Sequence, residues 1–263
     1  MRKYWFLFKG YLATMIEYRG VAISWALIEV VALFSSLFLW IAVYADKTNV
    51  GNYNFGQMIF YYAFIPLVGS LTEVYVASSL PRMIKDGRIS ADLLKPFNLS
   101  FCQFIKTLSI KVAQQILKIP IFLFSIIIIF NLFKLNVDPI KIILSLSFCL
   151  FALVLNFFID LCLSYTAFWL DDVWALKHLK IVLLLVFGGM AFPLDLASGI
   201  IKSIFYFLPF KFVYFVPISI VKGMDFSSLI NNYLQLFVWI LFFGLISKIL
   251  WRFGIKKYGA YGN

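Results

Sequence analysis

The chain has 263 residues, of which 63% are hydrophobic and only 13% are charged, and its formal net charge is +11. An ordinary soluble domain carries about 25% charged residues, so this composition excludes a soluble globular protein. Lys and Arg gather in the cytoplasmic loops of membrane proteins, which explains the positive charge without any binding to nucleic acid. The sequence predicts an all-α integral membrane protein, with residues 1–263 forming one domain.

Apolar runs along the chain predict six transmembrane helices. Lipid offers no hydrogen-bond partners to the backbone, so each run is expected to be helical, and about 20 residues suffice to cross the bilayer. The predicted spans are residues 21–44, 55–80, about 116–133 with an earlier start left open, 140–170, a fifth beginning with 181–192, and about 229–251. Six spans place both termini on the side that holds most of the 23 lysines and arginines, which is the cytoplasmic side.

Two further segments are apolar without being predicted spans. Residues 4–18 repeat aromatic and aliphatic side chains at helical spacing, which predicts a helix in the cytoplasmic interface. A ragged start of the first span is the alternative. Residues 193–224 are interrupted by Pro193, Pro209 and Pro217. A seventh span here would move the basic C-terminal tail outside, so we expect broken, partly re-entrant helices on the outer side.

The loop between spans two and three, residues 81–100, concentrates charge in an otherwise apolar chain. Gly87 permits a sharp turn, and Ser90 is expected to cap a short helix over residues 91–95, which Pro96 helps to end. The adjacent leucines of this helix would project outside the membrane. Because so short a helix is unstable alone in water, they need a partner surface, either another protein or the chain's own helix ends.

Three carboxylates fall within predicted spans: Glu29, Glu73 and Asp160. An ionised carboxylate at the bilayer centre costs about 2.5–3.5 kcal/mol on insertion scales, so such groups face protein or water. Two interpretations stay open for them. They form a substrate or proton site, or they form structural ion pairs with Lys111, Lys118 or a lysine near a span end.

Residues typical of catalysis or metal binding are scarce. The chain has one histidine and three scattered cysteines, so we expect no catalytic, cofactor or metal site. It also contains no G-x-x-x-x-G-K-[ST] phosphate loop. We therefore do not expect an enzyme, and a membrane-embedded lipid-modifying enzyme is disfavoured.

The loop "IKDGRISADLLKPFN" resembles the "G-x-(I/L)-x-x-x-L-L-x-P" loop of ABC-2-type transporter permeases, in their daunorubicin-resistance-like branch. "YR" at Tyr18–Arg19, "GGMAFPL", "FLPF", "YFVPISIVKG" and the ending "WRFGIKKYGAYGN" are similar to other parts of that family. The chain departs from the pattern after Pro193, where no second proline follows until Pro209.

This resemblance implies the permease subunit of an ATP-binding cassette exporter in a bacterial-type plasma membrane. It implies two copies of a separate ATPase that binds ATP and Mg²⁺, a second permease chain, identical or paralogous, and a hydrophobic or amphipathic substrate in contact with membrane lipid. The loop would be the coupling helix that contacts the ATPase, through Gly87, Arg88, Ile89, Ser90, Asp92, Leu93, Leu94, Lys95 and Pro96. A stand-alone secondary transporter or channel is the alternative function, with the three carboxylates as its ion site.

Overall fold

The computed structural model describes residues 2–17, 19–133 and 138–258, and nearly all of them are helical. Tyr18 and the ending from residue 259, which contribute to the family resemblance, lie outside the described residues. In chain order the elements are α1 (Arg2–Glu17), α2 (Arg19–Val43), β1 (Asn49–Val50), β2 (Tyr53–Asn54), α3 (Phe55–Thr72), η1 (Val76–Ser78), α4 (Leu80–Lys85), α5 (Ile89–Leu93), α6 (Leu99–Phe133), α7 (Pro139–Tyr165), η2 (Thr166–Phe168), α8 (Trp174–Phe187), η3 (Leu194–Leu196), α9 (Gly199–Phe207), η4 (Pro209–Phe212), α10 (Phe215–Lys222) and α11 (Phe226–Lys257).

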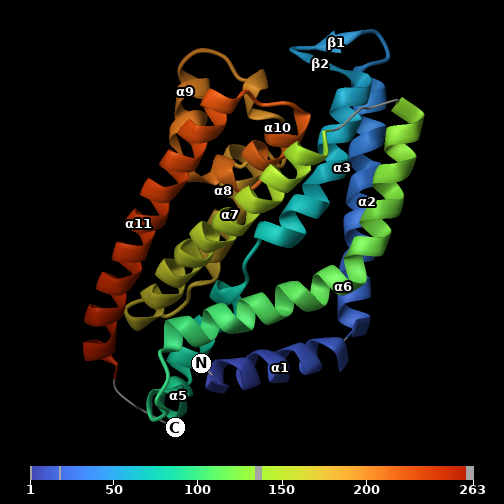
Figure 1. The fold of residues 1–263 in the computed structure, drawn as a ribbon. Helices are drawn as coiled ribbons and strands as arrows, with labels where there is room; N and C mark the ends of the chain where they lie inside the picture. The colour runs from blue at the N-terminus through green and yellow to red at the C-terminus, as the bar shows by residue number, and fades with distance from the viewer. Residues whose placement is uncertain (1, 18, 134–137, 259–263) are drawn as a thin grey trace.

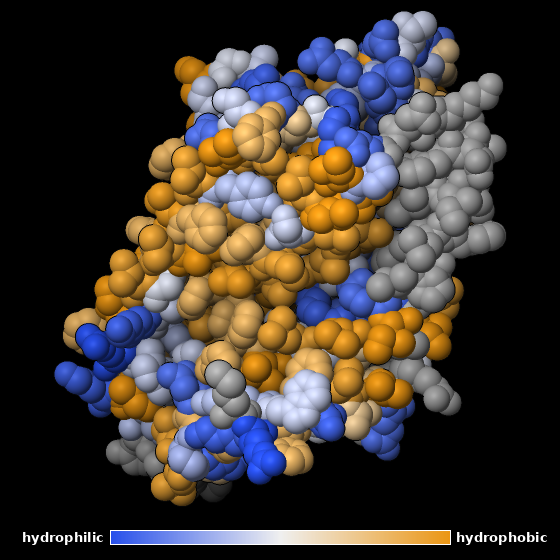
Figure 2. All heavy atoms as spheres, in the orientation of Figure 1, coloured by the Kyte–Doolittle hydropathy of each residue, from blue (hydrophilic) through white to orange (hydrophobic). Residues whose placement is uncertain are grey.

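The long helices run between two ends of the molecule (Figure 1). The β1–β2 hairpin, α9 and α10 lie at one end, while α1, α5, the start of α6 and the end of α11 lie at the other. The face drawn in Figure 2 is apolar across its middle and hydrophilic at both ends. An apolar band between two polar ends is what a bilayer requires, and it agrees with the predicted all-α membrane protein.

Three helices of the described residues are long and apolar enough to cross a membrane. They are Phe55–Thr72, Pro139–Phe168 and Phe226–Lys257, and Leu27–Val43 is a shorter apolar helix. The described helices thus confirm the class of protein, while the count of six spans stays a prediction. The proline-rich segment after α8 is broken into η3, α9, η4 and α10, as the prolines predicted.

Buried apolar side chains form two clusters. The larger one lies among α3, α7, α10 and α11 and includes Tyr61, Phe148 and Tyr214. The smaller one includes Leu80 of α4 and Ile89 of α5, both fully buried. The loop between spans two and three is therefore anchored in this smaller cluster, which also contains side chains of α7. It is not a solvated linker.

The second span is shorter than predicted. Residues 55–80 were expected to form one helix, but α3 ends at Thr72, and Glu73, its C-cap, is extended. The chain then continues through residues 74 and 75 to η1 and α4. Side chains of other helices bind the freed carbonyl groups of this break, so packing overrides the helical continuity that the apolar run indicated.

The third helix is longer than 116–133, since α6 begins at Leu99. Figure 1 shows it bent, its first part beside α1 and its second part beside α2. The earlier start that the prediction left open is therefore present, and Lys111 and Lys118 are buried residues of this helix.

The predicted start of the fifth span was also wrong, because α8 begins at Trp174 and ends at Phe187. Lys180 is a buried residue of this helix. The N-terminal segment is a helix, α1, as its periodicity predicted, and the Ser109 hydroxyl of α6 donates to its Phe8 carbonyl at 3.2 Å. Its place at a membrane surface stays a prediction.

Candidate functional site

The loop after α4 forms a short helix that presents apolar side chains outward. Gly87 has φ 71°, in the left-handed region that favours glycine, and lets the chain turn from α4 into α5. Ile89 at the start of α5 is fully buried, whereas Leu93 is 40% and Leu94 is 89% exposed. Leu94 therefore does not fold back onto the described part of its own chain, and a short, anchored helix is left with an apolar tip.

The predicted cap of this helix was wrong. α5 covers Ile89–Leu93 and not residues 91–95, and Arg88 precedes it without a side-chain cap. The buried Ile89 fixes this earlier start, because it must face the core. Ser90 instead forms a hydrogen bond with the Tyr258 hydroxyl at 2.7 Å, and the same hydroxyl donates to the Gly87 carbonyl at 2.9 Å.

Two other segments also hold the loop. The Lys85 ammonium forms an ion pair with Asp171, at 3.1 Å, in the turn before α8. The Lys3 ammonium of α1 donates to the Pro96 carbonyl at 2.5 Å, and the Tyr4 ring packs edge-on to Phe101 with centroids 4.7 Å apart. Three segments therefore converge on this loop: the start of α1, the residue that follows α11, and the turn before α8.

Four further charges of the loop pair locally. Arg88 pairs with Asp86 at 2.5 Å and Lys95 with Asp92 at 2.8 Å. Hydrogen bonding to the Asp92 carboxylate raises the pKa of Lys95. Because these charges are already paired, the exposed leucine is the feature of the loop that still needs a partner.

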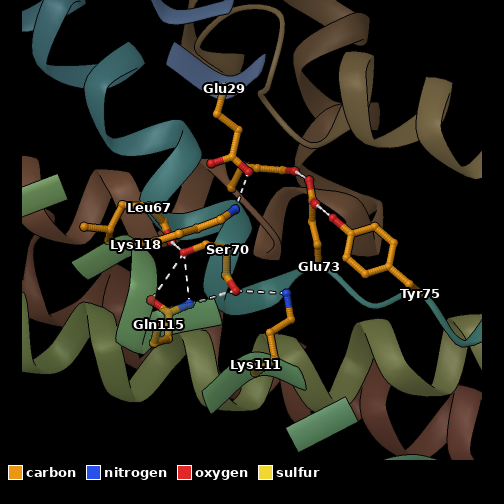
Figure 3. A network of polar contacts seen from close by, with 9 residues as sticks. Glu29, Leu67, Ser70, Glu73, Tyr75, Lys111, Gln115 and Lys118 are labelled. Atoms are coloured by element: carbon orange, nitrogen blue, oxygen red, sulfur yellow. Dashed lines mark hydrogen bonds and ion pairs between the residues drawn. The ribbon is translucent and has the colours of Figure 1, made fainter. Parts of the chain in front are cut away.

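A second constellation surrounds the break after α3 (Figure 3). The Ser70 carbonyl accepts hydrogen bonds from the Lys111 ammonium at 2.9 Å and the Gln115 amide at 3.0 Å. The Thr72 carbonyl accepts from the Asn156 amide at 2.9 Å. Carbonyl groups at a helix end have no partners within the helix, and side chains of α6 and α7 satisfy them here.

Glu73 occupies the break itself. Its carboxylate accepts hydrogen bonds from the Tyr75 and Tyr214 hydroxyls. The neighbouring Glu29 of α2 forms an ion pair with Lys118 of α6 through Oε1. Its Oε2 is buried and has no hydrogen-bond partner among the described residues. Glu29, Glu73, Lys111 and Lys118 thus lie within one cluster of polar contacts (Figure 3).

Two cavities meet at Glu73. One, of about 200 Å³, lies among α2, α3 and α8 and is lined by Glu29, Tyr62, Glu73 and Tyr214 among others. The other, of about 30 Å³, is lined by Glu73 together with side chains of α6 such as Lys106. A carboxylate at a helix break between two cavities can take part in a pathway for polar groups through an apolar layer.

Asp160 lies apart from these cavities. It forms an ion pair with Lys180 of α8, and its Oδ2 accepts from the Ala77 amide at 3.1 Å. Asp160 therefore pairs with neither of the predicted partners, Lys111 and Lys118. Lys118 pairs with Glu29, while Lys111 binds a backbone carbonyl and forms no ion pair among the described residues.

Several of these residues were not predicted. Tyr75, Tyr214 and Tyr258 gave no signal in a chain so rich in aromatics. Gln115 did give one, because it lies four and three residues from the predicted lysines 111 and 118, and these spacings place the three polar side chains on one face of a helix. That stripe indicates a helix whose polar face is buried against other helices.

A chain that is almost entirely helical and has buried polar networks within an apolar band is an integral membrane protein. The family model described as ABC-2 family transporter protein matches residues 30–262. The chain therefore belongs to the ABC-2 transporter family, as the loop motif indicated, and it is a membrane permease component of an ABC transporter. The searches of curated proteins and of solved structures found no match.

Proposed function

We propose that the chain is the membrane-spanning subunit of an ATP-driven exporter and that α5 receives the motion of the ATPase. Family membership implies pairing with an ABC ATPase, and the chain has no phosphate loop of its own. The observation that carries the proposal is the side chain of Leu94, 89% exposed at the end of a helix braced by three other segments. An exposed apolar tip on a rigid base suits a groove on another protein.

The proposed assembly follows the family resemblance. Two ATPase subunits, which bind ATP and Mg²⁺, lie beneath two permease chains, identical or paralogous. The α5 end, with both termini, faces the cytoplasm of a bacterial-type plasma membrane. The substrate is hydrophobic or amphipathic, because aromatic side chains such as Tyr62 and Tyr214 line the cavity that it would pass.

We propose further that the break at Glu73 transmits the motion. Closure of the ATPase would move α5, and α4 would follow because Leu80 and Ile89 share one core. The non-helical residues between α3 and η1 let this unit turn without bending α3. The cavity between Glu29 and Glu73 would then change its access from one side of the membrane to the other.

Substitution of Leu93 and Leu94 by aspartate tests the coupling role. The full-length chain is affinity-purified from membranes of its own host, and a co-purifying ATPase is identified by mass spectrometry. We expect the double variant to insert normally and to lose the ATPase, since each buried contact of this kind contributes about 2 kcal/mol or more. Asn98→Asp is the matched control, because it adds a negative charge next to the loop and an aspartate can still cap α6.

An unchanged yield of ATPase with the Leu93/Leu94 variant would refute the coupling role. Transport by the purified chain that resists vanadate and is abolished by an uncoupler would instead support a secondary transporter.

A further inference from the structure

A cavity of about 320 Å³ lies at the end of the molecule opposite α5. It is lined by side chains of β2, η3, α9, η4, α10 and the start of α11, including Tyr53, Asp195, Tyr206, Lys211 and Lys222. Figure 1 shows the hairpin, α9 and α10 together at this end. The proposed coupling route does not use these residues, so their chemistry needs a separate explanation.

One oxygen of Asp195 lacks a partner. The Tyr53 hydroxyl donates to Oδ2 at 3.0 Å, whereas Oδ1 is buried without a hydrogen bond among the described residues. An unsatisfied buried acceptor loses its hydration without compensation. Oδ1 is therefore complementary to a hydrogen-bond donor, and above all to a positively charged one.

Two ammonium groups line the same cavity. Lys211 is 2% exposed, and its ammonium donates to the neutral Gln235 amide oxygen at 2.8 Å. The Lys222 ammonium lies 3.2 Å from the centroid of the Tyr53 ring. Among the described residues neither lysine forms an ion pair with a carboxylate. The cavity is thus lined by two ammonium groups without an ion-pair partner among the described residues, beside an Asp195 oxygen that has no donor. Asp225 also lines the cavity, but its carboxylate accepts from the Ser228 amide and caps α11.

The exposed face of α9 indicates what lies next to this cavity. Ile200, Ile204 and Phe207 are 81%, 47% and 71% exposed, and their spacing places them on one side of the helix. Tyr206 of the same helix lines the cavity. An amphipathic helix with an exposed apolar face suits the surface of a bilayer.

We infer that this cavity binds a zwitterionic headgroup that carries a primary ammonium and a phosphate, as in a phosphatidylethanolamine lipid. The ammonium donates to Asp195 Oδ1, and the phosphate lies against Lys211 and Lys222. The exposed face of α9 would accommodate the acyl chains. A free zwitterion such as phosphoethanolamine has the same chemistry, and the experiment separates the two sources.

Thermal unfolding of the purified full-length chain in a mild detergent, followed by tryptophan fluorescence, tests the inference. The probes are lysophosphatidylethanolamine, lysophosphatidylcholine, lysophosphatidylglycerol and soluble O-phosphoethanolamine. We expect lysophosphatidylethanolamine to raise Tm most. The choline analogue cannot donate a hydrogen bond to Asp195, and the glycerol analogue has no ammonium.

Two pairs of variants locate the effect. Asp195→Asn and Lys211→Gln are expected to raise the half-saturating concentration of lysophosphatidylethanolamine roughly tenfold or more, the size of one lost charge-assisted hydrogen bond. Asp46→Asn and Lys47→Gln, exposed substitutions in the turn after α2, serve as matched controls and should leave it unchanged. Should Asp195→Asn unfold, the comparison of headgroups on the unaltered chain still decides the question.

Equal stabilisation by the three lysolipids would overturn the inference, because it would indicate a non-specific apolar surface. A response to the glycerol analogue alone would also overturn it, in favour of a simple anion site. A response to O-phosphoethanolamine as large as that to the lysolipid would support the headgroup chemistry and identify a soluble ligand. The Leu93/Leu94 variant should respond like the unaltered chain, so failure of the coupling role and failure of this site are distinguishable.

Discussion

Asp160 of α7 and Lys180 of α8 form a deeply buried ion pair, with 1% and 7% of the two residues exposed. Neutralising either residue leaves the other charge without its partner inside the protein. Asp160→Asn removes the negative charge that faces Lys180 and leaves one acceptor oxygen for two donors, the Lys180 ammonium and the Ala77 amide. Lys180 makes no other hydrogen bond among the described residues. Lys180→Met leaves Asp160 one donor, the Ala77 amide at 3.1 Å.

The expected cost follows from this geometry. Breaking a buried pair by removing one partner destabilises a protein by about 3–5 kcal/mol, and we expect Asp160→Asn to fall in that range. Lys180→Met should cost less, since the Asp160 carboxyl group keeps its bond to the Ala77 amide. The double variant removes both charges, so it should recover roughly 2 kcal/mol relative to the sum of the single variants.

Reversible unfolding in mixed micelles measures these differences, after membrane insertion has been checked. The exposed pair of Lys85 and Asp171 provides the matched control, because breaking a surface ion pair costs about 1 kcal/mol or less. Asp160→Asn and Lys180→Met variants that unfold like this control, but no longer transport, would refute the structural role. Asp160 would then be a functional charge.

Three smaller changes test other parts of the structure. Tyr258→Phe removes the hydroxyl that holds α5, so hydrogen exchange of α5 should rise while the fold is retained. Gly189→Ala should lower stability by about 1–3 kcal/mol in thermal unfolding, because its φ is +88° and a Cβ would lie 2.6 Å from the Tyr61 hydroxyl oxygen. Gly10→Ala, with nothing within 4 Å, should not destabilise the chain. Asn54→Ala breaks the capping box of α3 and should cost about 1 kcal/mol in the same assay.

The sequence was sufficient for the class of protein, because apolar runs and scarce charge leave a membrane as the only suitable solvent. The sequence also identified the loop after α4. Gly87 supplies its turn, and the adjacent leucines lie outside every predicted span. The prolines 193, 209 and 217 predicted a broken segment for a local reason, since proline restricts the backbone wherever it lies.

The break in α3 could not be predicted in the same way. No glycine or proline follows Thr72 before Pro81, so nothing local interrupts the helix. The groups that stabilise the break, Lys111, Gln115 and Asn156, come from α6 and α7 and act only after the helices have packed. The burial of Lys180 has a related reason, because its ion pair with Asp160 forms only after α7 and α8 have packed.

The break also explains why Glu73 and α5 belong to one mechanism under the proposed function. A continuous helix from residue 55 to 85 would transmit a push from α5 along its axis and leave the cavity around Glu29 unchanged. With the helix broken, motion of α4 and α5 acts on Glu73 and on its two tyrosine donors. The α3 side of the break stays fixed, because Lys111 and Gln115 of α6 bind the Ser70 carbonyl. Replacing both Lys111 and Gln115 by methionine should therefore loosen the C-terminal end of α3, while the exposed leucines can still bind the ATPase. We expect that variant to co-purify with the ATPase and to lose substrate transport.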